Sequence, residues 1–301
     1  MLSNYSVNVQ SLDLQAITKI NVRAAVLRLD KIHPVVSGNK WFKLKYYLQD
    51  ALQNNYQTVL TFGGAWSNHI IATAYACRDA GMHSIGVIRG EQSLSLSTTL
   101  QSALGYGMQL EFVDRHTFQA RDKTELVKKL VNKWGRLYII PEGGAGIPGI
   151  RGSEEILASI PYQKYSHIMC CIGTGTMFMG VVNSSLPTQE LIGIPVLKGM
   201  GHLPEQFREF FKEPARMDQC KVLYDYHFGG YAKKTPGLIQ FMNQFHQQTG
   251  IPTDFVYTAK LMFAFTDLLE KNYFTPDSHI LIIHSGGLQG NTSLKPGTLA
   301  F

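Results

Sequence analysis

Short apolar runs of four to six residues recur along the whole chain, separated by amphipathic stretches with helical spacing. This alternation is typical of βα units around a parallel sheet, so we predict an α/β fold. The expected strands span residues 24–29, 58–62, 84–88, 109–113, 137–140, 167–172, 191–196 and 280–283. Helices are expected at residues 69–80, 124–132, 176–184 and 258–271.

Several of these runs lead directly into glycine-rich segments, namely FGGAWSNH, IPEGGAG, CIGTGTMFMG and IHSGGLQG. In open parallel sheets, ligands bind beyond the carboxyl ends of the strands, where glycine lets the backbone approach and helix N-termini present free N–H groups. We therefore expect the four segments to form one shared site.

No tandem repeat, low-complexity tract or long linker divides the chain, so a second domain would be an insertion. Residues 44–140 contain enough βα units for a small sheet of their own. Residues 1–43 and 141–301 would then form a larger domain.

The composition excludes few partners. A net charge of +6 without a run of like charges does not specially indicate nucleic acid, although it favours small anions. The chain has no signal-like start and no unbroken run of roughly 18 apolar residues, so we expect a cytoplasmic protein without a membrane segment. The cysteines lack metal-binding spacing, and we expect the adjacent Cys170 and Cys171 to be reduced core thiols.

The segment SGNKWFKLK places Lys40 directly after a turn, where a helix should begin. A lysine becomes a nucleophile, and can form a Schiff base, when burial or cationic neighbours favour its neutral amine. On local sequence alone, a solvent-facing lysine is the commoner outcome. A cation at a helix N-terminus is mildly unfavourable, which argues for a special role of Lys40. We expect Lys43 and Lys45 to face water.

Ser67 and Asn68 follow two glycines at the start of an expected helix. Either residue could simply cap the helix, but capping does not explain the pair together with Gly63 and Gly64. In the functional interpretation, Ser67 binds a carboxylate or moves a proton, and the Asn68 amide bonds a ligand oxygen.

The segment GTGTMFMG follows a strand and opens a helix, the arrangement in which backbone N–H groups hold phosphate. Its glycine spacing matches neither a dinucleotide fingerprint nor a P-loop. Binding of a single phosphate by Gly173, Thr174, Gly175 and Thr176 fits better than binding of a nucleotide.

Tyr257 stands at an expected helix start and could transfer protons, although a structural tyrosine is equally common. Ser285 could bond a heteroaromatic nitrogen, or could serve only the turn before its two glycines. The histidines lack the spacing of a helical metal pair, so we expect no metal site.

Seven motifs in order resemble the pyridoxal-phosphate enzymes that include 1-aminocyclopropane-1-carboxylate deaminase and D-cysteine desulfhydrase. These motifs are SGNKWFKL, GGAWSNH, IPEGGAG, GTGTMFMG, FGGYAK, VYTAK and HSGGLQG, and they follow a VLRLDKIHP segment that is also similar. The resemblance implies the tryptophan-synthase-β-like fold, called fold type II, with two αβα domains around parallel or mixed sheets. The cofactor, pyridoxal 5′-phosphate, lies between the domains, and such enzymes are usually homodimers.

The resemblance also implies roles for individual residues. Lys40 matches the lysine that binds the cofactor as a Schiff base, and Ser67 matches the serine that contacts the substrate carboxylate and is proposed to move a proton. Further matches are Asn68 at the phenolic oxygen of the cofactor, the GTGT loop at its phosphate, Thr258 and Ser285 near the cofactor, Tyr231 and Tyr257 facing the substrate, and Trp66, His69, Glu142 and Gly143 beside the substrate.

Two positions suggest the substrate. In this family, the ring-opening deaminases tend to carry Glu and Leu where this chain has Thr258 and Ser285, whereas the desulfhydrases carry small hydroxyl residues. The expected reaction is therefore β-elimination from a small amino acid, with D-cysteine as the reference substrate. Trp66 and Ile71 depart from the family pattern, and bulk at Trp66 could narrow the pocket. The alternatives are cyclopropane ring opening and, in a different class, a nucleotide-binding α/β protein.

Overall fold

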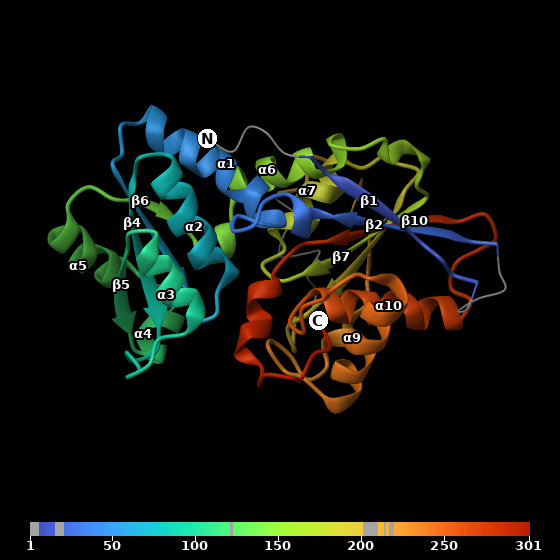
Figure 1. Ribbon diagram of the computed structural model, residues 1–301. Coiled ribbons are helices and arrows are strands. Elements are labelled where there is room, and N and C mark those ends of the chain that lie inside the picture. The colour runs from blue at the N-terminus through green and yellow to red at the C-terminus, as the bar shows by residue number, and fades with distance from the viewer. Residues whose placement is uncertain (1–5, 16–20, 121–122, 201–209, 214, 217–219) are drawn as a thin grey trace.

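The structure is a computed structural model that describes residues 6–15, 21–120, 123–200, 210–213, 215–216 and 220–301. Two sheets organise these residues, and Figure 1 shows them on opposite sides of the molecule. The α/β fold predicted from the alternating runs is confirmed.

The larger sheet has six strands in the order β1-β2-β10-β7-β8-β9. All neighbours are parallel except β1, which pairs with β2 antiparallel. The strands span Asn8–Leu12 (β1), Arg23–Arg28 (β2), His167–Ile172 (β7), Glu190–Pro195 (β8), Cys220–Val222 (β9) and His279–His284 (β10). The central strands are buried on both faces, which explains why they are continuous apolar runs.

The smaller sheet has four parallel strands in the order β5-β4-β3-β6. They span Thr58–Gly63 (β3), His83–Arg89 (β4), Met108–Val113 (β5) and Tyr138–Ile140 (β6). Separate apolar clusters cover the sheet. One contains side chains from α4 (Arg115–Gln119) and α5 (Thr124–Trp134), and the other contains side chains from α2 (Asn68–Asp79) and α3 (Thr98–Gly105). This sheet lies inside residues 44–140, and the domain limits themselves stay a prediction.

Helices pack around both sheets (Figure 1). Around the smaller sheet they are α2 (Asn68–Asp79), α3 (Thr98–Gly105), α4 (Arg115–Gln119) and α5 (Thr124–Trp134). Around the larger sheet they are α6 (Ile147–Ala158), α7 (Thr176–Ser184), α9 (Pro236–Thr249) and α10 (Thr258–Glu270). Helix α1 (Asn39–Gln53) packs against both α6 and α2, so it links the two groups.

All eight predicted strands and all four predicted helices form, each with bounds within two residues of the prediction. Two strands were missed. β1 is a half-exposed edge strand without an apolar run, and β9 has only three residues. The cysteines are free, and Cys170 and Cys171 are buried as expected.

Candidate active site

A cavity of about 350 Å³ lies where the carboxyl ends of strands from both sheets come together. The four glycine-rich segments meet at this cavity, as the sequence predicted. The predicted site residues that line it are Lys40, Ser67, Asn68, His69, Glu142, Gly143, Gly173, Thr174, Gly175, Tyr231, Tyr257 and Ser285.

Three other predicted residues do not line the cavity. Trp66 is 39% exposed at the surface beside it. Thr176 is buried at the start of α7, with its hydroxyl 3.0 Å from that of Thr174. Thr258 is fully buried, and its hydroxyl donates to Asp254 Oδ1 at 2.7 Å, so it serves an internal hydrogen bond.

Lys40 is held at the cavity by contact between two loops. The backbone N–H of Asn39 donates to the Ser285 carbonyl at 3.1 Å, and Gly38 has a positive φ of 66°. A Cβ on Gly38 would lie 1.9 Å from that carbonyl oxygen, so only glycine allows this approach. The Lys40 amine donates to Asn39 Oδ1 at 2.7 Å. Burial lowers the pKa of Lys40 to about 8, which makes the neutral, nucleophilic amine accessible near neutral pH.

The expectation that Lys43 faces water is wrong. This residue is only 4% exposed and lines the cavity, with its Nζ 3.3 Å from the Gly143 carbonyl and 3.4 Å from Thr174 Oγ1. Burial, and then the charge of Lys40, lower the pKa of Lys43. Lys45 is instead partly exposed and pairs with Glu155 at 2.7 Å.

Ser67 combines a structural task with a position in the cavity. As the N-cap of α2, its Oγ accepts hydrogen bonds from the N–H groups of His69 at 3.2 Å and Ile70 at 3.3 Å. Both acceptor positions are thereby used, which leaves the hydroxyl proton to be donated to a ligand. The turn needs Gly63, because a Cβ there would lie 2.8 Å from Ser67 Oγ.

The tautomer of His69 follows from its neighbour. Thr61 Oγ1 donates to the Ile140 carbonyl at 2.9 Å, so at 2.8 Å from His69 Nε2 it must accept. His69 therefore carries its proton on Nε2, and Nδ1 is a bare acceptor. Burial and the charges of Lys40 and Lys43 lower the pKa of His69, which keeps the ring neutral.

Buried acceptors at the cavity lack partners inside the protein. Within the described residues, His69 Nδ1 and Asn68 Oδ1 accept no hydrogen bond, although the Asn68 amide nitrogen donates to the Gly287 carbonyl at 3.3 Å. Unpaired buried polar atoms are unfavourable, so such atoms indicate a bound polar ligand.

The segment Gly173–Thr176 lies between β7 and α7, with Gly175 in the left-handed conformation at a φ of 80°. The first N–H groups of a helix have no acceptor within the helix, and here the residues around the start of α7 line the cavity together with Lys43, whose amine lies 3.4 Å from Thr174 Oγ1. This combination of backbone N–H groups and one ammonium suits an anion such as phosphate.

Two tyrosines and a serine complete the lining. The rings of Tyr231 and Tyr257 meet edge to face, with centroids 6.1 Å apart, and burial raises the pKa of both phenols, so both stay protonated. Ser285 Oγ lies 3.2 Å from Cys171 Sγ. Burial raises the pKa of Cys171 to about 11, so this thiol is neutral at physiological pH.

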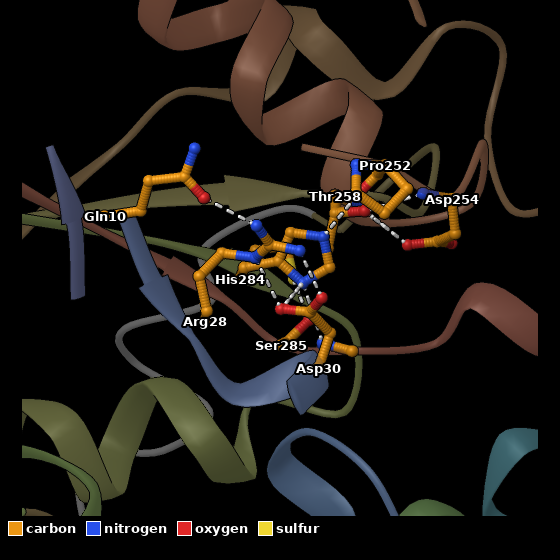
Figure 2. A network of polar contacts seen from close by, with 10 residues as sticks. Gln10, Arg28, Asp30, Pro252, Asp254, Thr258, His284 and Ser285 are labelled. Atoms are coloured by element: carbon orange, nitrogen blue, oxygen red, sulfur yellow. Dashed lines mark hydrogen bonds and ion pairs between the residues drawn. The ribbon is translucent and has the colours of Figure 1, made fainter. Parts of the chain in front are cut away.

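A buried polar network lies behind Ser285, and Figure 2 shows it from close by. Arg28 donates to both Asp30 oxygens, at 2.9 and 2.6 Å, and to Gln10 at 2.7 Å. His284 Nδ1 lies 3.3 Å from Asp30 Oδ1, and His284 Nε2 forms a hydrogen bond with the Pro252 carbonyl at 2.8 Å. The network joins the ends of β2 and β10, the strands that lead into the Lys40 and Ser285 loops.

In the described part of the chain, no group of three His, Cys, Asp or Glu side chains is placed to hold a metal ion. No helix in the same part of the chain is long and apolar enough to cross a membrane.

A family model described as pyridoxal-phosphate dependent enzyme matches residues 8–286, which is most of the chain. The chain belongs to the pyridoxal-phosphate dependent enzymes. The prediction of the cofactor is thereby confirmed, and so is the prediction that the protein is an enzyme.

Relatives of this pyridoxal-phosphate enzyme carry the two names that the sequence suggested. A putative 1-aminocyclopropane-1-carboxylate deaminase of Pyrococcus horikoshii is 30% identical over 273 residues, 85% of this chain and 81% of the relative. A D-cysteine desulfhydrase of Klebsiella pneumoniae is 28% identical over 287 residues, 88% of this chain and 87% of the relative.

A solved structure described as an ACC deaminase homologue superposes with a TM-score of 0.80 at 28% identity, covering 97% of this chain and 92% of that chain. A hydrogen sulfide-producing enzyme of Fusobacterium nucleatum has the same fold, with a TM-score of 0.69 at 14% identity over 96% of each chain. The prediction of a fold-type-II α/β enzyme is confirmed.

The residues of this pyridoxal-phosphate enzyme fit the cofactor. The cavity offers a lysine with a lowered pKa, an anion site at the start of α7 and buried acceptors without internal partners. Ser285 is joined to the Lys40 loop by the Asn39 hydrogen bond.

Sequence reasoning missed several lining residues, chiefly Asn39, Lys43, Arg89 and Cys171. Lys43 carried a usable signal, because it stands three positions after Lys40 on the same face of α1. Arg89 also carried one, since it ends a strand of the parallel sheet.

Proposed function

We propose that this enzyme removes the amino group of a small amino acid by β-elimination, as a D-cysteine desulfhydrase does. D-cysteine, with uptake of one water, would give a keto acid, ammonia and sulfide. The observation that carries the proposal is that the Lys40 amine, with a pKa of about 8, shares one cavity with the phosphate loop and with Ser67.

Lys40 would hold pyridoxal phosphate covalently until the substrate amine takes its place. The bound cofactor supplies an electron sink for the charge left on Cα when its proton is removed. The freed Lys40 amine or Ser67 Oγ would move that proton. Tyr231 and Tyr257, both protonated, would donate hydrogen bonds to the substrate.

The remaining residues would bind and orient the ligands. The GTGT loop and Lys43 would hold the phosphate, and Asn68 the phenolic oxygen. The free Ser67 proton and the N-terminus of α2 would hold the substrate carboxylate, with His69 Nδ1 accepting from an ammonium or hydroxyl group. Glu142 and Gly143 would line the substrate side.

Ser285 would influence which reaction the bound substrate undergoes. Its neutral hydroxyl, next to the neutral Cys171 thiol, would leave the pyridine nitrogen less protonated than a carboxylate would. Thr258, in contrast, is engaged by Asp254 and would act on the site only through that carboxyl. Less charge would then be drawn into the ring, which suits elimination.

A second candidate is ring opening of 1-aminocyclopropane-1-carboxylate to 2-oxobutanoate and ammonia, a deaminase reaction that takes up water. It is favoured by the 30% identity with the relative that carries this name. We further propose a cytoplasmic homodimer, with large-domain residues 1–43 and 141–301 and small-domain residues 44–140 on either side of the cofactor.

The test is release of keto acid over a panel of D-cysteine, L-cysteine, β-chloro-D-alanine, D-serine and 1-aminocyclopropane-1-carboxylate. Turnover of D-cysteine supports the first candidate, and turnover of the cyclopropane substrate alone supports the second. Purified Lys40→Ala protein should lack the visible absorption of the bound cofactor. If that absorption persisted, the assignment of Lys40 would be wrong.

A further inference from the structure

Arg89 is a cavity residue for which the proposed function has no use. It ends β4 and lines the cavity from the side of the smaller sheet. Its Nη2 lies 3.4 Å from the position that a Cβ on Gly64 would take, next to the turn that carries Ser67. Its positive charge also acts on the Tyr231 phenol, where it opposes the rise in pKa that burial causes.

Within the described part of the chain, the Arg89 guanidinium has no polar partner: no oxygen there accepts a hydrogen bond from it and no carboxylate forms an ion pair with it. The Phe118 ring lies beside it, with its centroid 5.7 Å from the guanidinium carbon. Arg28, in comparison, is fully bound by Asp30 and Gln10. A half-buried arginine with five free donors is suited to a carboxylate or a similar anion.

The proposed function already assigns a task to the other cationic groups of the cavity and to Ser67. In it, Lys40 would hold the cofactor, Lys43 lies 3.4 Å from Thr174 of the phosphate loop, and Ser67 with the start of α2 would take the substrate carboxylate. Glu142 is the acidic residue in the lining. Arg89 is then left on the substrate side with no counter-ion among the described residues.

We propose that Arg89 selects substrates that carry a second anionic group, as an acidic side chain or an acidic β-substituent. The inference rests on the proposed function, since it takes the first carboxylate to be bound at Ser67. A planar guanidinium binds a carboxylate through two parallel hydrogen bonds, so Arg89 would distinguish ligands by both their charge and their shape.

Calorimetric titration of the cofactor-loaded enzyme tests this. The ligands are aspartate against asparagine and glutamate against glutamine, in both enantiomers. None has a β-leaving group that would be eliminated during the titration. We expect one acidic ligand to bind at least about tenfold more tightly than its neutral counterpart, the gain typical of a charged hydrogen bond.

In Arg89→Gln enzyme the preference should disappear, while the neutral ligand keeps its affinity. Arg89→Lys should keep part of the preference, because charge remains but the paired geometry is lost. Arg136→Gln is the control, since Arg136 stacks on Tyr56 away from the cavity. It should leave the preference unchanged.

Equal affinity for acidic and neutral ligands in the wild type would overturn the proposal, and so would a preference that survives Arg89→Gln. Failure of the proposed function has a different signature. In that case the cofactor-loaded wild type would release no keto acid from any substrate of the panel, whereas its preference for acidic ligands can still be titrated.

Discussion

The two sides of the cavity are built differently. On the side of the larger sheet, the Lys40 and Ser285 loops are locked together by the Asn39 hydrogen bond and by the close approach of Gly38. A buried ion pair between Arg28 and Asp30 lies behind them. On the side of the smaller sheet, Trp66 is 39% exposed and Arg89 is only half-buried.

This difference separates the part of the cavity suited to cofactor binding from the part suited to substrate selection. The interlocked side offers the groups suited to the cofactor, which must stay in place through every turnover. The less anchored side offers the groups suited to the substrate, where related enzymes can differ. Substitutions on the first side should therefore change cofactor binding or the stability of the buried network, and substitutions on the second side should change substrate binding or turnover while the cofactor stays bound.

The largest effect is expected on the substrate side, from Ser67→Ala. Loss of a group that moves or positions a proton should lower kcat/KM by about 10²- to 10⁴-fold. The visible absorption of the cofactor should remain, because Lys40 and the phosphate loop are intact. Absorption spectra and steady-state rates measure both.

A matched control for Ser67 is Thr235→Ala. Thr235 caps α9 through the Leu238 N–H at 3.2 Å, so this variant loses a similar cap outside the cavity. Each variant should lose about 1 kcal/mol of stability from the cap alone. Equal activity losses in the two variants would contradict a role of Ser67 in the reaction.

Asp30→Asn should destabilise the cofactor side. It leaves the buried Arg28 guanidinium, 2% exposed, without its counter-ion, which should cost about 3–5 kcal/mol. Burial alone would raise the pKa of Asp30, but the Arg28 hydrogen bond and the charges of His284 and Arg28 together outweigh it and lower the pKa below its usual value. The wild type should therefore keep this stabilisation above pH 4 and lose it as the pH falls further.

Urea unfolding of the Asp30→Asn protein and of a control variant measures the loss of stability. The control is Glu125→Gln, since Glu125 pairs with Lys128 at 2.9 Å and both side chains are exposed. Exposed pairs contribute about 0–1 kcal/mol, so the control should unfold close to the wild type. A small effect of Asp30→Asn would show that the cofactor side does not depend on its ion pair.

Lys43→Met should weaken cofactor binding. Removing one charged hydrogen bond to phosphate should raise the dissociation constant of pyridoxal phosphate by about 10- to 100-fold. Lys45→Met is the control, because the Lys45 amine pairs with Glu155 at 31% exposure. If both variants bound the cofactor alike, the phosphate would not lie at Lys43.

Much of the fold could be predicted because buried parallel strands are continuous apolar runs. β1 could not, since as an edge strand it carries no such run. The glycine-rich segments could be placed at one site because parallel strands end at the same edge. The residues that contact these segments could not be predicted. The pairing of β2 with β10, for example, brings Asp30 next to His284, which lies 254 positions away in the sequence.

The two lysines of α1 show the same limit. Lys40 was singled out by its turn, and the glycine loops elsewhere in the chain strengthened that prediction. The burial of Lys43 depends on the approach of Gly143 and Thr174, which come from two other segments. Helical spacing predicts which face of α1 a residue lies on. The packing of the two sheets decides which loop covers that face.

The smallest predicted effect concerns the pH at which Lys40 accepts the cofactor. Only the neutral amine attacks an aldehyde, and burial lowers the pKa of Lys40 from 10.5 to about 8. The rate at which cofactor-free enzyme recovers its visible absorption should therefore rise about tenfold between pH 7 and pH 9 and level off above it.

A lysine with the ordinary pKa would respond differently, because its rate would rise about a hundredfold over the same interval without levelling off. The reaction of pyridoxal phosphate with Nα-acetyllysine, run in the same buffers, corrects for ionisation of the cofactor itself. A corrected profile that still climbs at pH 10 would mean that the Lys40 amine is as well solvated as a surface lysine. The cofactor side of the cavity would then be as open to water as the substrate side, and the contrast between them would not hold.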